Sequence, residues 1–193
     1  MNARDNPFAT ARVLRIRYAL PDGDWPALLA RVEACGYRGA LVGPHGAGKT
    51  TLLEDLQQQL EARGIPTVWL RRDMERPHFT RAELDAAFAR ITREHVICLD
   101  GAEQLTRLGW MQFKRRARAA RGLIITSHRE GLLPTLHTCS TNVQLLEDIV
   151  GRLLTPAPHA HPTSLPTSND LFERHRGNLR DALRELYDCY ATC

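Results

Sequence analysis

The chain has 193 residues, of which 43% are hydrophobic and 25% are charged. These values fit one globular domain, with or without a small appended subdomain, and exclude a disordered or fibrous chain. The formal net charge of +4 permits an acidic partner but does not require one. No apolar run approaches membrane-spanning length, and the first seven residues lack the layout of a signal peptide, so we expect a cytoplasmic protein without a membrane partner.

Periodicity, capping residues and turn residues predict a regular alternation of helices and strands. After an irregular lead-in over 1–22, the predicted elements in chain order are a helix over 24–36, a strand over 37–42, a helix over 51–63, a strand over 64–70, a helix over 80–93, a strand over 95–100, a long helix ending near 121, a strand over 122–127, a short strand over 135–139 and a helix over 141–154. This order of elements predicts an α/β domain.

Sequence signals in the last third of the chain separate a helical tail from the α/β domain. Thr141 and Gln144 are spaced as a capping box for the helix that begins there. Four prolines in residues 155–168 predict a linker, in which His159 and His161 are expected to be solvated. Beyond it, Gly177 separates two predicted helices.

Cysteine usage gives no sign of a disulfide framework or a zinc site. The five cysteines are odd in number, scattered along the chain and without metal-ligand spacing. We therefore expect free thiols. The residues are Cys35, Cys98, Cys139, Cys189 and Cys193.

A phosphate-binding loop lies between the first predicted strand and the helix that follows it. The stretch Gly43-Pro44-His45-Gly46-Ala47-Gly48-Lys49-Thr50 fits the pattern G-x-x-x-x-G-K-[ST], and Thr51 continues it into the helix. The glycines let consecutive N–H groups point at a phosphate, and the helix N-terminus adds partial positive charge. In this pattern Lys49 reaches the β- and γ-phosphates and the Thr50 hydroxyl is placed for Mg²⁺. The loop thus predicts ATP and Mg²⁺ as cofactors.

An acidic residue ends the predicted strand over 95–100. Four apolar residues, Val96 to Leu99, precede Asp100, so a buried parallel strand would deliver this carboxylate to the carboxyl edge of the sheet. An aspartate at this place can also simply cap the next helix. Because it follows a phosphate loop, we favour a Walker B role in which Asp100 shares a Mg²⁺ site with Thr50.

Together these motifs resemble the AAA+ and STAND branches of the P-loop NTPases. The resemblance covers nearly the whole chain and implies a three-layer sandwich with a parallel five-stranded sheet of order 5-1-4-3-2 and a small C-terminal helical lid. It implies a core over 1–154, a linker over 155–168 and a lid over 169–193. In such proteins the fourth strand ends in sensor 1 and an arginine opening a lid helix is sensor 2. Thr126 and Arg180 match those positions.

The residue after Asp100 departs from the pattern of many AAA+ proteins, which place the catalytic glutamate there. This chain has Gly101 at that position, and the next acid is Glu103. The arrangement resembles the NACHT group of STAND proteins and makes Glu103 the expected water-positioning base. The alternative is that Glu103 is a favourable acid in the first turn of the following helix. In that case the protein would hydrolyse ATP very slowly, as a switch.

A basic run from Lys114 to Arg121 has three interpretations. It is a solvated helix face, a sequence-independent contact to a phosphate backbone, or a source of arginines acting in trans. The resemblance to AAA+ assemblies implies the last, in which Arg118 or Arg121 of one copy in a homo-oligomer would reach the nucleotide of its neighbour.

The leading functional hypothesis is an AAA+/STAND-type ATPase or ATP-driven conformational switch. Two alternatives remain open at this point. One is a non-hydrolysing, nucleotide-dependent module that binds DNA or a protein client. The other is a small-molecule P-loop kinase, which would need an arginine-rich lid over an acceptor site.

Overall fold

The computed structural model describes residues 6–20, 24–73, 75–155 and 165–191. The described chain forms two compact units. A sheet unit contains residues of 18–43 and 49–138, and a helical unit contains residues up to 17, residues 44–48 and residues after 138. The predicted division at 154 and 168 stays a prediction, and most of the predicted linker, including His159 and His161, lies outside the described residues.

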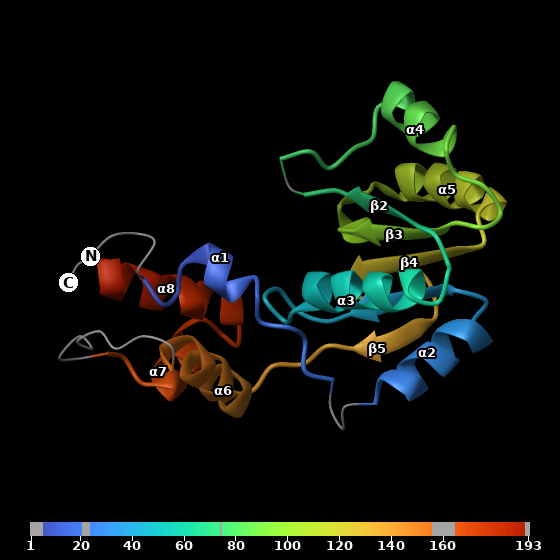
Figure 1. Cartoon of the computed structure of the whole chain (residues 1–193). Coiled ribbons are helices and arrows are strands. Elements are labelled where there is room, and N and C mark those ends of the chain that lie inside the picture. Colours follow the sequence, from blue (N-terminus) through green and yellow to red (C-terminus); the bar gives the residue numbers. More distant parts are fainter. Residues whose placement is uncertain (1–5, 21–23, 74, 156–164, 192–193) are drawn as a thin grey trace. The chain divides into compact units, whose positions relative to one another are not determined.

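The sheet unit is built on a sheet of five parallel strands (Figure 1). The strands are β1 (Arg38–Val42), β2 (Thr67–Arg71), β3 (Val96–Asp100), β4 (Gly122–Ser127) and β5 (Thr135–Thr138). Their order is β2-β3-β4-β1-β5, which confirms the order 5-1-4-3-2 and the short fifth strand. Every residue of β3 and β4 is buried. Such continuous burial is typical of parallel strands that helices cover on both faces.

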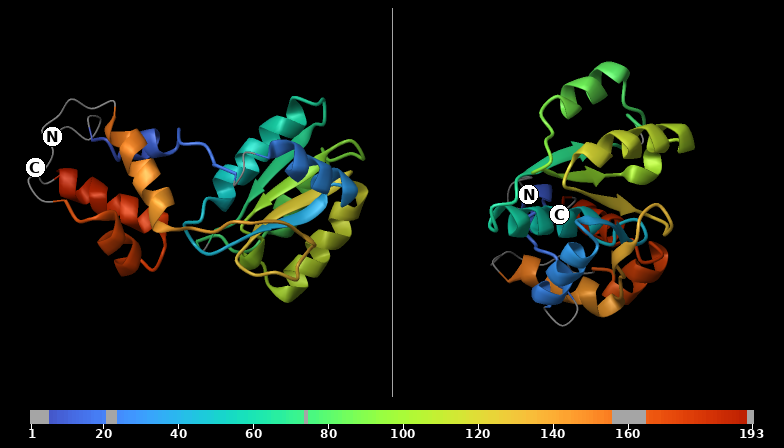
Figure 2. Two further views of the ribbon diagram at one scale, coloured as in Figure 1. Left: turned by 90° about the horizontal axis from the view of Figure 1, so that it is seen from below. Right: turned by 90° about the vertical axis from the view of Figure 1, so that its right-hand side faces the viewer.

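Helices cover both faces of the sheet, giving the expected three layers (Figure 2). On one face α3 (Lys49–Glu61) packs against β1, β2, β3 and β4, and α2 (Trp25–Ala34) contacts β5. On the other face α4 (Arg81–Phe88) and α5 (Arg107–Arg116) share a core with alternate residues of the strands. The Asp24 cap of α2 and the Thr80–Glu83 capping box of α4 are present as predicted.

The long helix predicted after β3 is interrupted, so this prediction was wrong in extent. The chain first makes a 3₁₀ turn, η2 (Ala102–Gln104), and α5 starts only after Thr106, whose hydroxyl accepts a hydrogen bond from the Gly109 N–H. A second 3₁₀ turn, η3 (Ala117–Ala119), follows α5. The capping residue Thr106 was overlooked, and a side-chain cap of this kind fixes where a helix begins.

Phe113 lies at the centre of the aromatic core beneath α4 and α5. Only 1% of it is exposed. Its ring centroid lies 5.5 Å from those of Phe79 and Phe88 and 6.4 Å from that of Trp110. Aromatic side chains bury large areas and add specific ring contacts, so this cluster holds both helices on the sheet.

The helical unit brings together both ends of the described chain. It contains α1 (Thr10–Val13), α6 (Val143–Leu154), α7 (Ser168–Arg174) and α8 (Leu179–Ala191). The Phe8 ring lies 5.2 Å from that of Tyr190, and the Asn6 side-chain amide donates to the carbonyl oxygen of Tyr187. Leucines of α6, α7 and α8 fill the same core.

The start of α6 differs from its prediction. Asn142, not Thr141, caps the helix, because its side chain accepts a hydrogen bond from the Leu145 N–H. The Thr141 hydroxyl donates instead to the carbonyl oxygen of Gly177, at the predicted turn between α7 and α8. A threonine next to a helix start can either cap the helix or bond to a more distant backbone group. Thr141 bonds to the distant Gly177 carbonyl oxygen and leaves the cap to Asn142.

Two further features bear on the predictions from composition. Cys35, Cys98, Cys139 and Cys189 form no disulfide within the described residues, and Cys193 lies outside them. Within the described part of the chain, no helix combines the length and the apolar character needed to cross a bilayer.

The first prediction concerns the aromatic core. Phe113→Ala should lower the free energy of unfolding by about 3–5 kcal/mol, because it removes a buried ring and leaves a cavity. Urea denaturation followed by circular dichroism measures this loss. Met111→Ala on the same helix is the control, since 66% of Met111 is exposed and little should change. Equal effects of the two substitutions would contradict the assigned core.

Candidate functional site

The loop predicted to bind phosphate joins β1 to α3. The Gly43 N–H donates to the carbonyl oxygen of Ser127 at 3.2 Å, which ties the start of the loop to β4. Lys49 is the first residue of α3 and is 8% exposed. Its Nζ donates to the carbonyl oxygen of Gly43 at 2.8 Å. The ammonium group is therefore held close to the helix N-terminus, where an anion is favoured.

Gly46, in the middle of this loop, cannot be replaced by a larger residue without rearrangement. Its φ angle of +72° lies in the left-handed region. A Cβ atom there would lie 1.9 Å from Oδ1 of Asn178 and 3.0 Å from the backbone nitrogen of Leu179. Residues 44–48 belong to the helical unit, and within it the tip of the loop therefore lies against the start of α8.

Asp100 links three elements of the sheet unit at the carboxyl edge of the sheet. The Thr50 hydroxyl lies 3.1 Å from Oδ1 and 3.2 Å from Oδ2 of Asp100. The Thr126 hydroxyl donates to Oδ1 at 2.8 Å. Arg71, opposite Asp100 in the sheet register, places its Nε 3.6 Å from Oδ2. The carboxylate is 6% exposed and stays hydrogen-bonded, as a buried charge requires.

The structure explains why a glycine follows Asp100. Gly101 has a φ angle of +84°, and a Cβ atom there would lie 2.1 Å from the carbonyl oxygen of Arg72. No side chain fits at this position unless the backbone moves. A catalytic glutamate directly after Asp100 is thus excluded by this backbone, and the next acid along the chain is Glu103 in η2.

Glu103 is half-buried and paired with a histidine. Its Oε1 lies 3.2 Å from Nε2 of His128, while Oε2 is buried without a hydrogen-bond partner among the described residues. Burial raises the pKa of Glu103; the charge of Asp100 adds to this rise and that of Lys49 opposes it. A carboxylate with a raised pKa is a better proton acceptor, which suits a general base. Two other predicted site residues, Asp100 and Lys49, therefore both influence the pKa of Glu103.

Thr126 and Arg180 are placed differently from each other. Thr126 is 1% exposed, and besides donating to Asp100 its hydroxyl accepts a hydrogen bond from the Gly101 N–H. Arg180 is exposed on α8 in the helical unit, and its backbone N–H donates to the Asn178 side chain. Their sensor roles stay predictions.

The two arginines proposed to act in trans also differ. Arg118 is exposed in the middle of η3. The guanidinium of Arg121 lies 4.5 Å from the centroid of the Tyr37 ring and donates to its hydroxyl at 3.3 Å. Arg121 thus already contributes to packing within its own chain, whereas the part of either arginine in an oligomer stays a prediction.

Sequence reasoning missed three residues at these sites. His128 and Arg71 each stand at or just after the carboxyl end of a strand, which is the signal that identified Asp100. Asn178 directly follows the predicted turn at Gly177, and its contact with Gly46 joins residues far apart in the chain. No local pattern could have revealed that contact.

The side-chain oxygens of Thr50 and Asp100 are suitable ligands for a magnesium ion. Mg²⁺ prefers hard oxygen ligands and is usually held by one or two protein groups, with waters and substrate phosphates completing its shell. A hydroxyl and a carboxylate that already lie within hydrogen-bond distance of each other, beside a buried ammonium, meet that requirement.

Comparisons with known proteins agree with the fold. No family model matches the chain. Over 69 residues, 35% of this chain and 38% of the other, it is 44% identical to adenylyl-sulfate kinase of Synechococcus sp. (strain JA-2-3B'a(2-13)). The RuvB Holliday junction branch migration motor of Thermotoga maritima superposes with a TM-score of 0.58 at 18% identity, over 90% of this chain and 64% of that one. A mutant form of RuvB gives a TM-score of 0.60 at 17% identity, with the same coverage.

These matches limit what can be concluded. The chain spans less than two thirds of each of these proteins. At such low identity the likeness to RuvB shows the fold alone. It is a P-loop NTPase fold with the strand order that the family resemblance of the motifs implied.

The second prediction concerns Thr126. Thr126→Val keeps the shape of the side chain but removes the hydroxyl that serves Asp100 and the Gly101 N–H, so stability should fall by about 1–3 kcal/mol. Thr126→Ser keeps the hydroxyl and should lose less than the valine variant. Urea denaturation measures both, and a valine variant as stable as wild type would refute the structural role of this hydroxyl.

Proposed function

We propose that the chain binds ATP with Mg²⁺ and hydrolyses it, as an ATPase or ATP-driven switch of the AAA+/STAND type. The observation that carries the proposal is the convergence of Lys49, Thr50 and Asp100 at the end of the phosphate loop. A buried cation, a hydroxyl and a carboxylate lie together at the carboxyl edge of a parallel sheet, where α/β folds place their ligands.

Each of these residues has a distinct task in the proposal. Backbone N–H groups of residues 45–51 hold the phosphates, and Lys49 donates to oxygens of the β- and γ-phosphates. Thr50 and Asp100 hold the metal, and Thr126 keeps the Asp100 carboxylate in place. When bound, Mg²⁺ neutralises negative charge on the phosphate oxygens.

Glu103 acts as the base in this proposal. A water oxygen forms a bond to the γ-phosphorus, the bond from that phosphorus to the bridging oxygen breaks, and ADP leaves with the electron pair. The proton of the water passes to the Glu103 carboxylate. His128, 3.2 Å from Oε1, orients this carboxylate, so that Oε2 is left for the water.

Several observations support an AAA+/STAND assignment over other P-loop ATPases. The strand order and the likeness to RuvB fit it. The glycine directly after Asp100 and the acid three positions after Asp100, Glu103, fit a NACHT-like Walker B arrangement. Arg180 as sensor 2, and Arg118 or Arg121 acting in trans within a homo-oligomer, complete this proposal.

The match to adenylyl-sulfate kinase favours one alternative, a P-loop kinase. Its 44% identity extends over 69 residues only. The two activities are separated by incubating the protein with Mg²⁺-ATP alone and with adenylyl sulfate added. Phosphate release in the absence of acceptor supports the ATPase, whereas phosphoryl transfer that requires adenylyl sulfate supports the kinase. The third candidate, a non-hydrolysing DNA- or protein-binding module, would bind ATP but show neither reaction.

The third prediction tests the loop. Lys49→Ala should weaken ATP binding or turnover by at least ten-fold, about 1.4 kcal/mol, because a charge-assisted contact to the phosphates is lost. Isothermal calorimetry with Mg²⁺-ATP and a phosphate-release assay measure the two effects. Unchanged binding and turnover in a folded variant would refute the phosphate-loop assignment.

The fourth prediction separates an enzyme from a switch. Glu103→Gln keeps size and hydrogen bonding but removes the charge, so ATP should still bind with Mg²⁺ while hydrolysis falls by about 10²-fold or more. The control is Glu130→Gln at an exposed glutamate, which should leave turnover unchanged. If Glu103→Gln and wild type turned over equally at a rate near background, the switch would replace the enzyme.

A further inference from the structure

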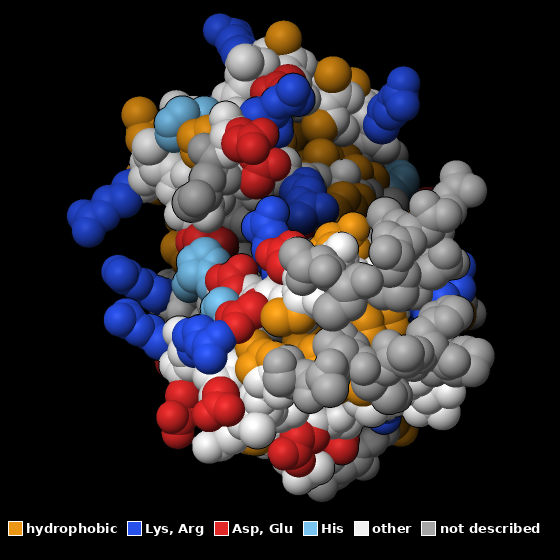
Figure 3. Space-filling model, turned by 90° about the vertical axis from the view of Figure 1, so that its left-hand side faces the viewer, with side chains coloured by type: hydrophobic (Ala, Val, Ile, Leu, Met, Phe, Trp, Pro, Cys, Tyr) orange, Lys and Arg blue, Asp and Glu red, His pale blue; other side chains and the backbone are white. Residues whose placement is uncertain are grey.

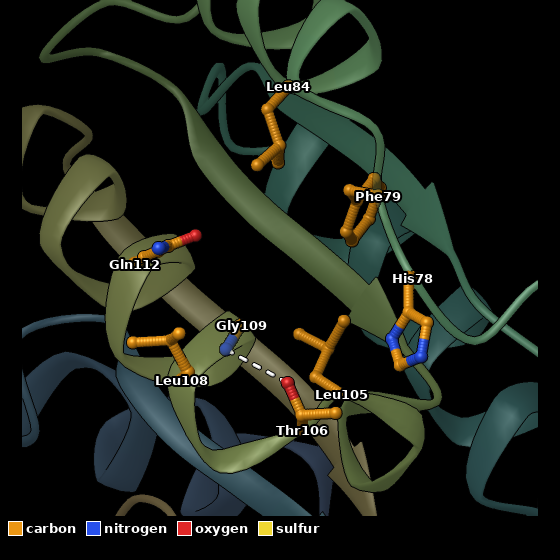
Figure 4. A pocket seen from close by; sticks show the side chains of 8 residues that line it. All are labelled: His78, Phe79, Leu84, Leu105, Thr106, Leu108, Gly109 and Gln112. Atoms are coloured by element: carbon orange, nitrogen blue, oxygen red, sulfur yellow. Dashed lines mark hydrogen bonds between the residues drawn. The ribbon is translucent and has the colours of Figure 1, made fainter.

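A partly open cavity of about 210 Å³, lined by both apolar and polar side chains, lies between α4 and α5 in the sheet unit. Its lining residues are His78, Phe79, Leu84, Leu105, Thr106, Leu108, Gly109 and Gln112. Figure 4 shows Leu108 and Gln112 of α5 on one side and Leu84, Phe79 and His78 on the other. The cavity contains none of the residues of the candidate nucleotide site.

The wall of the cavity is fixed by the core behind it. The Phe79 ring has two partners: the Arg72 guanidinium lies 3.5 Å from its centroid, and Phe113 is stacked against it with the ring centroids 5.5 Å apart. Arg72 is in turn paired with Glu83 at 3.3 Å. A preformed pocket loses little freedom when a ligand enters it, which favours binding.

Exposed apolar side chains gather beside the cavity. Among the described residues the large hydrophobic side chains that are exposed are Leu14, Leu108 and Met111, and two of these three lie one helical turn apart on α5. Leu108 is 65% exposed and Met111 66%. Methionine is enriched at protein interfaces and adapts its shape to a partner. Single exposed apolar residues are common, but a pair beside a cavity whose lining includes Phe79, Leu84 and Leu105 favours a contact surface.

The charged side chains of the segment that carries this pair all have one sign. From Arg107 to Arg121 the sequence contains no Asp or Glu. Arg116 is paired with Asp85, and Arg121 stacks on Tyr37. In the described part of the chain, Arg107, Lys114 and Arg115 have no ion pair or hydrogen bond from their side chains. By contrast, acidic and basic side chains are interspersed on the face seen in Figure 3.

Helical spacing places these cations along the apolar pair. Leu108, Met111 and Arg115 are three and four residues apart and share one face of α5. Arg107 and Lys114, seven residues apart, lie along the edge of that face away from the cavity. The result is a face on which Arg115 lies between Leu108 and Met111, with the cavity on one side and Arg107 and Lys114 on the other. We call this face with its charged edge the α5 surface, formed by Arg107, Leu108, Met111, Lys114 and Arg115.

We propose that the α5 surface binds an acidic amphipathic segment of a partner protein, which places an apolar side chain in the cavity and its carboxylates against the cations. Helix-in-groove recognition uses apolar anchors at this spacing. A nucleic acid backbone would satisfy the cations but would leave Leu108 and Met111 without an apolar partner. The apolar pair therefore favours a protein segment.

The fifth prediction uses a synthetic probe and the full chain. The probe is a fluorescein-labelled helical peptide with leucine at every third or fourth position and glutamate elsewhere. Fluorescence anisotropy should show binding that weakens as salt rises. Leu108→Ser and Met111→Ser together, or Arg107→Gln and Arg115→Gln together, should each weaken binding by about ten-fold or more, as expected for anchor residues.

Matched controls and two further measurements make the proposal falsifiable. Leu14→Ser, at a leucine that is 67% exposed, and Arg93→Gln, at an exposed arginine, should leave peptide binding unchanged. No binding of the peptide, or equal losses in the controls, would overturn the proposal. The proposal would also be overturned if the protein bound labelled duplex DNA and not the peptide, and if this DNA binding depended on Arg107 and Arg115 but not on Leu108. If the protein did not bind the peptide but self-associated, and if Leu108→Ser abolished this self-association, the α5 surface would be an interface between copies of the chain.

Discussion

The buried carboxylate of Asp100 is the constraint on which the candidate nucleotide site depends. A desolvated negative charge must be hydrogen-bonded, and the chain meets this need from two separate elements. Thr50, in the first turn of α3, and Thr126, near the end of β4, both reach it. Satisfying one charge thus fixes the first turn of α3, strand β3 and the central strand β4 against one another. The geometry that suits a metal ion is also the geometry that stabilises the fold.

Much of this arrangement could be predicted from sequence, because the determining signals are local. Apolar runs identified the strands, and the G-x-x-x-x-G-K-T pattern identified the loop at the end of β1. The rule that polar residues ending parallel strands meet at one edge placed Asp100 near Thr50. The order of the strands did not follow from these patterns. It came from the resemblance to a family, because strand order depends on crossovers that no short window of sequence encodes.

The features that could not be predicted depend on contacts between distant residues. The Arg72 carbonyl oxygen lies so close to Gly101 that no side chain fits directly after Asp100, which explains why the next acid is Glu103. Arg72 directly follows β2 and is distant from Gly101 in the sequence. Likewise, the proximity of His128 to Glu103 requires the sheet to be formed first. The choice of Asn142 over Thr141 as the cap of α6 follows from the turn at Gly177, which captures the threonine hydroxyl. In each case tertiary structure decides between locally equivalent options.

The contact of Phe8 with Tyr190 has a consequence for the order in which the chain can fold during synthesis. The helical unit draws on the start of the chain, on residues 44–48 and on the last helix, whereas the sheet unit ends at Thr138. On the ribosome, the sheet can therefore assemble while α8 is still being translated. The helical core has to wait until α8 has been translated, and Phe8 and Val13 lack their partners in α8 until then. Newly made chains thus pass through a stage in which these apolar side chains are uncovered, and termination before α8 would leave that stage permanent.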